Sequence, residues 1–237
     1  LGSSNSIACT NIMLNAAVAE SLKIYADRLE NAEDFETALH DMIKKTIKDH
    51  KRIIFNGNGY DDSWIKEATE KRGLLNLRTT PDALPKILDK KNVEMLTSLK
   101  VFTEAEIRSR YEITLENYCK TVNIEALTMV DMTKKEILPA IESYIKELSK
   151  TASLKVEAVP GLTSKYESET ISRLSLLSDE IYTAVCDLEK SLVELKTASD
   201  ITEESVMIRD VILNKMAALR VPCDEAETLT AEKYWPF

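Results

Sequence analysis

Two long stretches of this sequence contain almost no residue that ends a helix, and a single Pro-Gly pair separates them. The first runs from about Thr103 to Ala152 and the second from about Thr163 to Ala198, with Pro160-Gly161 in between. In both stretches apolar side chains recur at the three-to-four-residue spacing of one helix face. The pattern predicts two long helices that turn back on each other and pair antiparallel.

The second stretch also carries a heptad repeat. The repeating apolar residues are Leu174, Ile181, Leu188 and Leu195, with Val185 and Leu192 interleaved. This spacing is a short coiled-coil signature. A third helix is expected to start at a cap, Asp200 or Thr202, and to end near Pro222. A short last helix is expected before Tyr234-Trp235, and together these helices predict a bundle.

The first stretch opens with a capping box. Thr103 is followed three residues later by Glu106, so that each side chain can bond the backbone amide of the other residue. Pro139 lies further along the same stretch. It is expected to kink the helix, because proline removes one backbone hydrogen bond and crowds the preceding turn.

The chain begins with a helix that is apolar on nearly every side, from Ser6 to Leu29. A helix of this kind belongs inside a core. The helix that follows, Phe35 to about Lys51, is amphipathic and has only one apolar stripe with which to cover it. We therefore expect the partner of the opening helix to lie upstream of Leu1, in a longer protein of which this chain is a piece.

Residues 52–102 are predicted to form a connector of short helices and turns. Asn56-Gly57-Asn58-Gly59 supplies residues that tolerate positive φ, and Asp61 or Asp62 then caps a helix that ends at Gly73. Thr80-Pro81 opens a further short helix. The predicted division of the chain is 1–51, 52–102 and 103–237, and the predicted fold class is mainly α.

Composition agrees with a helical fold and limits the partners. Only 5 Gly and 6 Pro occur in 237 residues, while 44% hydrophobic and 30% charged residues are ordinary for a globular chain. The net charge of -9 argues against general binding to a phosphate backbone, so no nucleic-acid partner is expected. No apolar run is long enough to cross a bilayer, so no membrane partner is expected either.

One local exception to the acidic balance is a basic helix face. Its residues are Lys44, Lys45, Lys48, Lys51 and Arg52. A solvated helix face is the favoured interpretation, with a local nucleic-acid contact as the alternative.

The four cysteines lie far apart, without the CxxC or CxxH spacing of a metal site. They are Cys9, Cys119, Cys186 and Cys223. The spacing favours buried thiols in a reducing cytoplasm.

No constellation of residues in the sequence indicates catalysis. The two imidazoles, His40 and His50, have no cysteine or carboxylate pair in metal-ligand register, so a surface role is favoured. Gly57-Asn58-Gly59 lacks the third glycine and the strand-to-helix setting of a dinucleotide loop, so it is interpreted as a turn.

The remaining polar and aromatic candidates have structural interpretations. The acidic pairs Asp61-Asp62 and Glu203-Glu204 are interpreted as charges at helix N-termini. Core packing is expected for the aromatic residues Trp64, Tyr111, Tyr118 and Tyr144. Accordingly no catalytic, cofactor-binding or metal-binding residue is predicted in this chain, which by residue chemistry alone is a helical, interaction-type polypeptide.

Several strings nevertheless resemble the C-terminal region of type III glutamine synthetases. They are LGSSNS at Leu1–Ser6 with the Ala-rich helix after it, RIIFNGNGY at Arg52–Tyr60, RYEITLENYCKTVNIEALTMVDMTKKEILPAI at Arg110–Ile141 and EKYWPF at Glu232–Phe237. The resemblance covers nearly the whole chain, although in residues 153–200 it depends mainly on the helical pattern rather than on matching strings.

The resemblance implies a ligase that uses ATP and divalent cations, Mg²⁺ or Mn²⁺, to join ammonia to glutamate. In that family the strand with a metal-binding Glu and a phosphate-binding Arg lies just before the position of Leu1, so no family catalytic residue maps onto this chain. Ser3, Ser4 and Asn5 would follow that strand directly, and helix capping explains them. The opening helices would be the end of a catalytic α+β domain.

Two interpretations follow. In the first, the chain is a C-terminal fragment of a cytoplasmic glutamine synthetase, inactive by itself, that supports the catalytic domain and mediates assembly. Its partners would be the missing N-terminal catalytic region and the other subunits of a homo-oligomer, expected to be a dodecamer. In the second, the chain is an independent helical scaffold that binds a partner through its hairpin.

Overall fold

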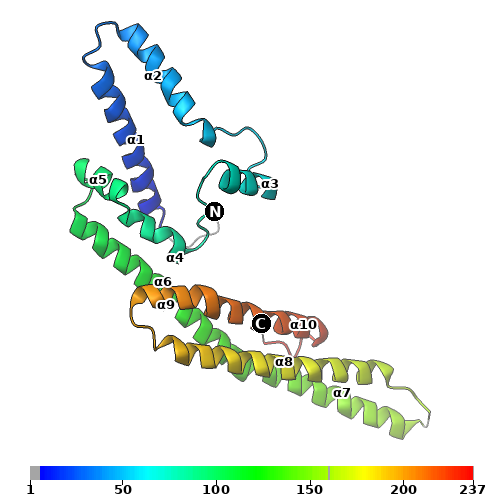
Figure 1. Ribbon diagram of the computed structural model, residues 1–237. Helices are drawn as coiled ribbons and strands as arrows, with labels where there is room; N and C mark the ends of the chain where they lie inside the picture. Colours follow the sequence, from blue (N-terminus) through cyan, green and yellow to red (C-terminus); the bar gives the residue numbers. More distant parts are fainter. Residues whose placement is uncertain (1–5, 160, 237) are drawn as a thin grey trace. The chain divides into compact units, whose positions relative to one another are not determined.

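The computed structural model describes residues 6–159 and 161–236, which form helices and no strands (Figure 1). This confirms the mainly α fold class. The chain divides into two compact units, Leu1–Tyr111 and Glu112–Phe237. The division into 1–51, 52–102 and 103–237 stays a prediction, as does the origin of the opening helices in a catalytic domain.

The first unit starts with two helices joined by a short polar turn. They are α1 (Ala8–Leu29) and α2 (Phe35–Asp49), which run in opposite directions (Figure 1). Asp34 caps α2, since its side chain accepts a hydrogen bond from the Thr37 amide at 3.3 Å. The short 3₁₀ turn η1 (Lys51–Ile53) follows.

Short elements make up most of the rest of this unit. They are α3 (Asp62–Lys66), the π-helical turn η2 (Glu67–Lys71), α4 (Thr80–Ala83), the 3₁₀ turn η3 (Leu84–Leu88) and α5 (Lys90–Ser98).

Local caps decide where these short elements begin and end. Asp61 caps α3 by accepting from the Ser63 amide at 2.8 Å. Gly73, with φ of 63°, ends the segment as predicted. The cap of α4 is Thr79 rather than the expected Thr80, which puts Pro81 one residue deeper in the first turn.

The turn at Asn56–Gly59 forms, but not for the reason expected. Positive φ occurs at Gly73 and Gly161 among the described glycines, and not at Gly57 or Gly59. Gly57 is required by a close approach instead, because a Cβ there would lie 2.6 Å from the tip of the Phe55 ring. That ring is stacked on Trp64 with the centroids 3.8 Å apart.

The buried core of the first unit is small. Ala16, Leu96 and Ile107 form it, where α1, α5 and the first turn of α6 meet. α6 (Glu104–Met132) begins with the predicted capping box: the Thr103 amide donates to Glu106 at 2.8 Å, and the Glu106 amide donates to the Thr103 hydroxyl at 3.3 Å.

The second unit contains the remainder of α6, the π-helical turn η4 (Thr133–Ile137) and α7 (Leu138–Ala158). Pro139 falls in the first turn of α7, directly after η4. A π turn adds one residue and widens the helix, so it accommodates a ring that would clash in regular α geometry. The π turn directly precedes Pro139, and the kink expected there stays a prediction.

α8 (Lys165–Leu195) returns along α7 and makes the predicted antiparallel hairpin (Figure 1). Gly161, with φ of 91°, lies in the turn, while Pro160 lies outside the described residues. All six heptad residues are buried, from Leu174 to Leu195. The predicted seam is thus the core of the second unit, and its coiled-coil character stays a prediction.

The chain then forms α9 (Ile201–Met207), the π-helical turn η5 (Ile208–Ile212) and α10 (Leu213–Leu229), which packs along α8. The predicted end near Pro222 is wrong, because Pro222 is buried inside α10. Cys223 and Ala226, beyond it, belong to the same core. Their burial favours continuation, although a proline inside a helix costs about 3 kcal/mol. The expected short final helix does not form separately, because α10 continues to Leu229 and residues 232–234 form a turn.

Ion pairs join the helices of the second unit across the apolar seam. Lys134 of η4 pairs with Glu189 of α8, and Lys155 of α7 pairs with Glu167 of α8. Arg173 of α8 holds both carboxylate oxygens of Glu225 in α10, at 2.5 and 2.6 Å. These contacts reinforce the antiparallel order of the helices.

No helix within residues 6–159 and 161–236 has the length and apolar character needed to cross a bilayer.

Candidate functional site

The two histidines and the carboxylates do not converge into a metal site in the described part of the chain. No three side chains from His, Cys, Asp and Glu come together there in an arrangement that holds a metal ion. His40 and His50 are both exposed, as expected of surface residues. We therefore assign no metal ligand among these residues.

The acidic pairs lie where helices begin. Asp61 and Asp62 occupy the cap and first turn of α3, and Glu203 and Glu204 lie in the first turn of α9. Asp200 is the cap of α9, since it accepts from the amides of Thr202 at 2.8 Å and Glu203 at 2.9 Å. These carboxylates stabilise helix ends, as the sequence indicated.

All four cysteines are free thiols, and their burial differs from the expectation. Cys119 and Cys223 are buried, and burial raises the pKa of each to about 11. A thiol with so high a pKa carries almost no thiolate at neutral pH. Cys186 is half-buried and Cys9 is exposed, so the prediction of four buried thiols is wrong for Cys9. The reason is that α1 buries only Ala16.

Tyr144 and Trp64 pack against other aromatic side chains, as predicted for them. Tyr144 is buried, bonds the Tyr166 hydroxyl at 2.9 Å and lies against the Tyr234 ring at 5.4 Å. The hydrogen bond to Tyr166, with burial, raises the pKa of Tyr144 to about 12, which keeps this hydroxyl protonated. Trp64 is half-buried against Phe55. Packing accounts for these side chains without a catalytic role.

α1 exposes a row of large apolar side chains. Leu14, Val18 and Leu22 lie on one face at four-residue spacing, and each is 58 to 62% exposed. Single exposed apolar residues are normal on a protein surface, but a continuous row indicates a contact surface. The sequence pattern had singled out this helix as one that belongs in a core.

An apolar groove lies in the second unit, between the α6–η4 segment and α10. Its volume is about 540 Å³, its apolar walls are Met129, Met132, Ile137, Cys223 and Trp235, and charged residues such as Arg220 and Asp224 lie at its edge. The Thr133 hydroxyl in the same wall donates to the Met129 carbonyl at 2.7 Å and so offers no free donor. The groove suits an apolar side chain better than a polar substrate.

A second hollow, in the first unit, has a basic rim. Lys44, Lys48, Lys51 and Arg52 line it beside Ile47 and Ile54, and Arg72 closes one side. The sequence pattern located the lysines but not Arg72, whose part depends on the fold of residues 55–72.

Comparison with known proteins now decides the family. Residues 38–156 match the glutamine synthetase C-terminal domain family. The chain belongs to this family. It is 35% identical over 204 residues, 86% of its length, to a glutamine synthetase of Butyrivibrio fibrisolvens. It is 29% identical along its whole length to a type-3 glutamine synthetase of Dictyostelium discoideum, and 27% identical over 99% of its length to a glutamine synthetase of Bacteroides fragilis.

The family assignment confirms the resemblance that the sequence strings indicated. The chain spans only 29 to 33% of the length of those relatives. Ser3, Ser4 and Asn5, the residues expected beside a catalytic strand, lie outside the described residues. The prediction that the family's catalytic residues lie outside this chain therefore stays a prediction.

Proposed function

We propose that this chain is the C-terminal part of a cytoplasmic enzyme that joins ammonia to the side-chain carboxylate of glutamate with ATP. Within that enzyme it supports the catalytic region and takes part in assembly of the subunits, for which we propose a dodecamer. Family membership supports the activity, and the length of the relatives supports a larger protein. The residues that act on substrate would belong to polypeptide outside this chain.

ATP and Mg²⁺ or Mn²⁺ would accompany the reaction in the whole enzyme. Such ions neutralise phosphate charge during phosphoryl transfer. The described residues do not offer a set of donors suited to a divalent cation, so none of them is proposed as a ligand of the ion. The contribution proposed for this chain is structural.

The apolar row on α1 is the observation on which the proposed support of the catalytic region depends. Full burial of each Leu or Val side chain in this row would contribute about 1.5 to 3 kcal/mol. The row is left open in the described structure. We propose that the catalytic region packs on this face, which would give the nearly all-apolar character of the helix a physical reason.

The apolar groove of the second unit is the surface we propose for subunit contacts. Its side chains come from α6, η4, α10 and the segment after α10, all of which belong to one compact unit. Ile124, on the same rim, is 62% exposed and would add to such a contact. Met side chains adapt to different partners, which suits an assembly surface.

The experiment compares the 237-residue chain with the longer protein encoded by the same reading frame. We expect γ-glutamyl transfer and ATP-dependent glutamine formation in the longer protein and none above background in this chain. Activity of the purified chain alone would contradict the proposal. A reading frame that starts at Leu1 and encodes no further domain would favour the alternative, an independent helical scaffold.

The supporting role is tested separately in the longer protein. Leu14→Glu with Leu22→Glu is expected to lower the stability and activity of the longer protein together, because the charges would be buried against the catalytic region. The matched control is Asn15→Glu, at an exposed position of the same helix. Equal effects of the control and the double variant would contradict the proposed contact.

A further inference from the structure

The basic hollow of the first unit is a built feature rather than a loose group of surface lysines. It is open, has a volume of about 690 Å³, and lies where the end of α2, η1 and Arg72 meet. Ile47 and Ile54 provide an apolar wall, and the side chains of Lys44, Lys48, Lys51 and Arg52 also line the hollow. Three segments of the chain therefore contribute to one concave surface.

Arg72 fixes the shape of this hollow. Its guanidinium donates to the backbone carbonyls of Arg52 at 3.2 Å and Ile54 at 2.9 Å, and to the Glu67 carboxylate at 2.6 Å. It also lies over the Trp64 ring, 4.9 Å from the centroid. Because Glu67 neutralises its charge, Arg72 braces the wall and leaves ligand binding to the other cations.

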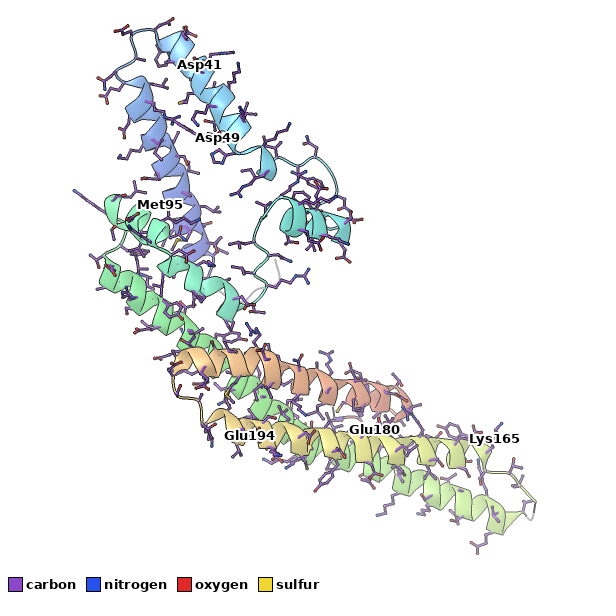
Figure 2. All side chains as sticks on the ribbon, in the orientation of Figure 1. Asp41, Asp49, Met95, Lys165, Glu180 and Glu194 are labelled. Atoms are coloured by element: carbon purple, nitrogen blue, oxygen red, sulfur yellow. The ribbon has the colours of Figure 1, made fainter. Side chains whose placement is uncertain are left out.

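The other four cations have no such partner. Lys44, Lys48, Lys51 and Arg52 form no ion pair with a carboxylate in the described part of the chain, whereas Lys45 on the same helix pairs with Asp49 at 2.6 Å. Asp49 lies near the end of α2 (Figure 2). Lys44 and Lys48 lie four residues apart on α2, where like charges repel one another, so an anion in the hollow would relieve that repulsion.

The distribution of charge between the two units distinguishes this basic cluster from the rest of the chain. Basic and acidic residues are equal in number in Leu1–Tyr111, so the net charge of -9 belongs entirely to Glu112–Phe237. The first unit is thus neutral overall and still gathers four unpaired cations at one hollow. A long polyanion would be repelled by the acidic chain as a whole, whereas a small anion meets only the local positive field.

We propose that this hollow binds a small ligand that carries two or more phosphate groups on an apolar body, the chemical class of nucleoside polyphosphates. Several lysines and an arginine match several phosphate oxygens, whereas a single phosphate or carboxylate would engage too few of them. Ile47, Ile54 and the lysine stems offer an apolar surface to the body of the ligand. The site needs none of the residues proposed for catalysis, so it is independent of the proposed function.

The test uses the 237-residue chain with Trp235→Phe, so that Trp64 beside the hollow is the sole tryptophan. ATP without metal, pyrophosphate and orthophosphate are titrated while Trp64 fluorescence is followed, with calorimetry as the second readout. Saturable binding is expected, tightest for ATP, weaker for pyrophosphate and weakest for orthophosphate. Affinity should fall as ionic strength rises.

Variants locate the binding. Lys48→Gln with Arg52→Gln should weaken ATP binding by roughly tenfold or more, because two charge-assisted hydrogen bonds are lost. The matched control Lys45→Gln removes a cation of the same helix that does not line the hollow, and it should change affinity by less than about twofold. Thermal unfolding of each variant shows whether the unit remains folded.

Three results would overturn the proposal. The first is ATP binding no tighter than orthophosphate, and the second is ATP binding that the double variant leaves unchanged. The third is a single-stranded RNA oligonucleotide that binds more tightly than ATP and depends on the same two residues, which would make the hollow a nucleic-acid contact. ATP binding that depends on Lys48 and Arg52 but not on Lys45 supports the proposal.

Discussion

The two units use similar helical sequences with opposite results. Along α8, Leu174, Ile181 and Leu188 are fully buried, whereas Leu14 and Leu22 along α1 are about 60% exposed. Both sets repeat at helical spacing. The difference is that α7 and α10 cover α8, whereas α1 buries only Ala16 where it meets α5 and the first turn of α6. An apolar stripe becomes core only where another element covers it.

Charge differs between the units as well. The second unit carries the whole net charge of -9 and uses ion pairs to join its helices, such as Arg173 with Glu225. The first unit is neutral but leaves cations unpaired around one hollow. This contrast indicates that the second unit is stabilised by its own contacts, while surfaces of the first are available to other molecules.

The largest expected effect is a substitution in the seam of the second unit. Ile181→Asp should lower the free energy of unfolding by about 3 to 5 kcal/mol, because it buries a charge and removes packing. Denaturation followed by Trp235 fluorescence in a Trp64→Phe background isolates this unit. The matched substitution Leu22→Asp in the isolated chain, followed by Trp64 fluorescence in a Trp235→Phe background, should cost less than about 1 kcal/mol. Equal losses of unfolding free energy for the two substitutions would contradict the proposed difference between the units.

A smaller effect is expected at the turn of the first unit. Gly57→Ala should cost about 1 to 3 kcal/mol, because its Cβ would displace the Phe55 ring from Trp64. Gly59→Ala is the control, since its Cβ meets nothing within 4 Å. Trp64 fluorescence in a Trp235→Phe background reports unfolding of this unit. A cost at Gly59 as large as that at Gly57 would contradict the close-approach explanation.

Loss of the capping box should have a similar or smaller effect. Thr103→Ala is expected to cost about 1 kcal/mol, because the amide of Glu106 loses its acceptor. Hydrogen exchange at the first turn of α6 should quicken. Ser109→Ala, at an exposed position further along α6, serves as the comparison and should leave exchange at that turn unchanged.

The smallest expected effect is on the pH dependence of stability, through the ion pairs between helices of the second unit. Arg173 holds the pKa of Glu225 below its ordinary value of 4.5, and Lys155 does the same for Glu167. Because the folded pKa is lowered, the stabilisation is present above pH 4.5 and is lost as pH falls through the folded pKa values. Glu167→Gln with Glu225→Gln should therefore flatten the acid limb of the stability curve followed by Trp235.

The control for this pH dependence is Glu169→Gln, whose partner Lys165 lies one turn away on the same helix. Figure 2 shows Lys165 at the start of α8. This variant should keep the slope of the unmodified chain. If Glu169→Gln flattened the acid limb of the stability curve equally, the ion pairs between helices would not account for the acid sensitivity.

Much of the fold was predictable because its signals are local. The capping box at Thr103, the cap at Asp61, the stop at Gly73 and the heptad of α8 all depend on residues within one or two turns of each other. Local hydrogen bonds and helical spacing suffice to specify such features.

The errors at Pro222 and Gly57 come from side-chain contacts that helical spacing does not report, and those around Pro222 involve residues distant in sequence. Pro222 did not end α10, because the residues on both sides of it pack into the core. Gly57 is required by the Phe55 ring rather than by positive φ. The brace at Arg72 depends on Arg52 and Ile54, roughly twenty residues earlier. No pattern of spacing along the chain reports such contacts.

The sequence by itself determined that this chain is helical, where most helices begin, which faces of the helices are apolar and which family the chain resembles. The tertiary structure alone decided which apolar face is covered, which cations find a carboxylate and whether a proline interrupts its helix. The physical reason is that spacing along the chain sets local geometry, whereas burial and charge pairing depend on what other segments bring close.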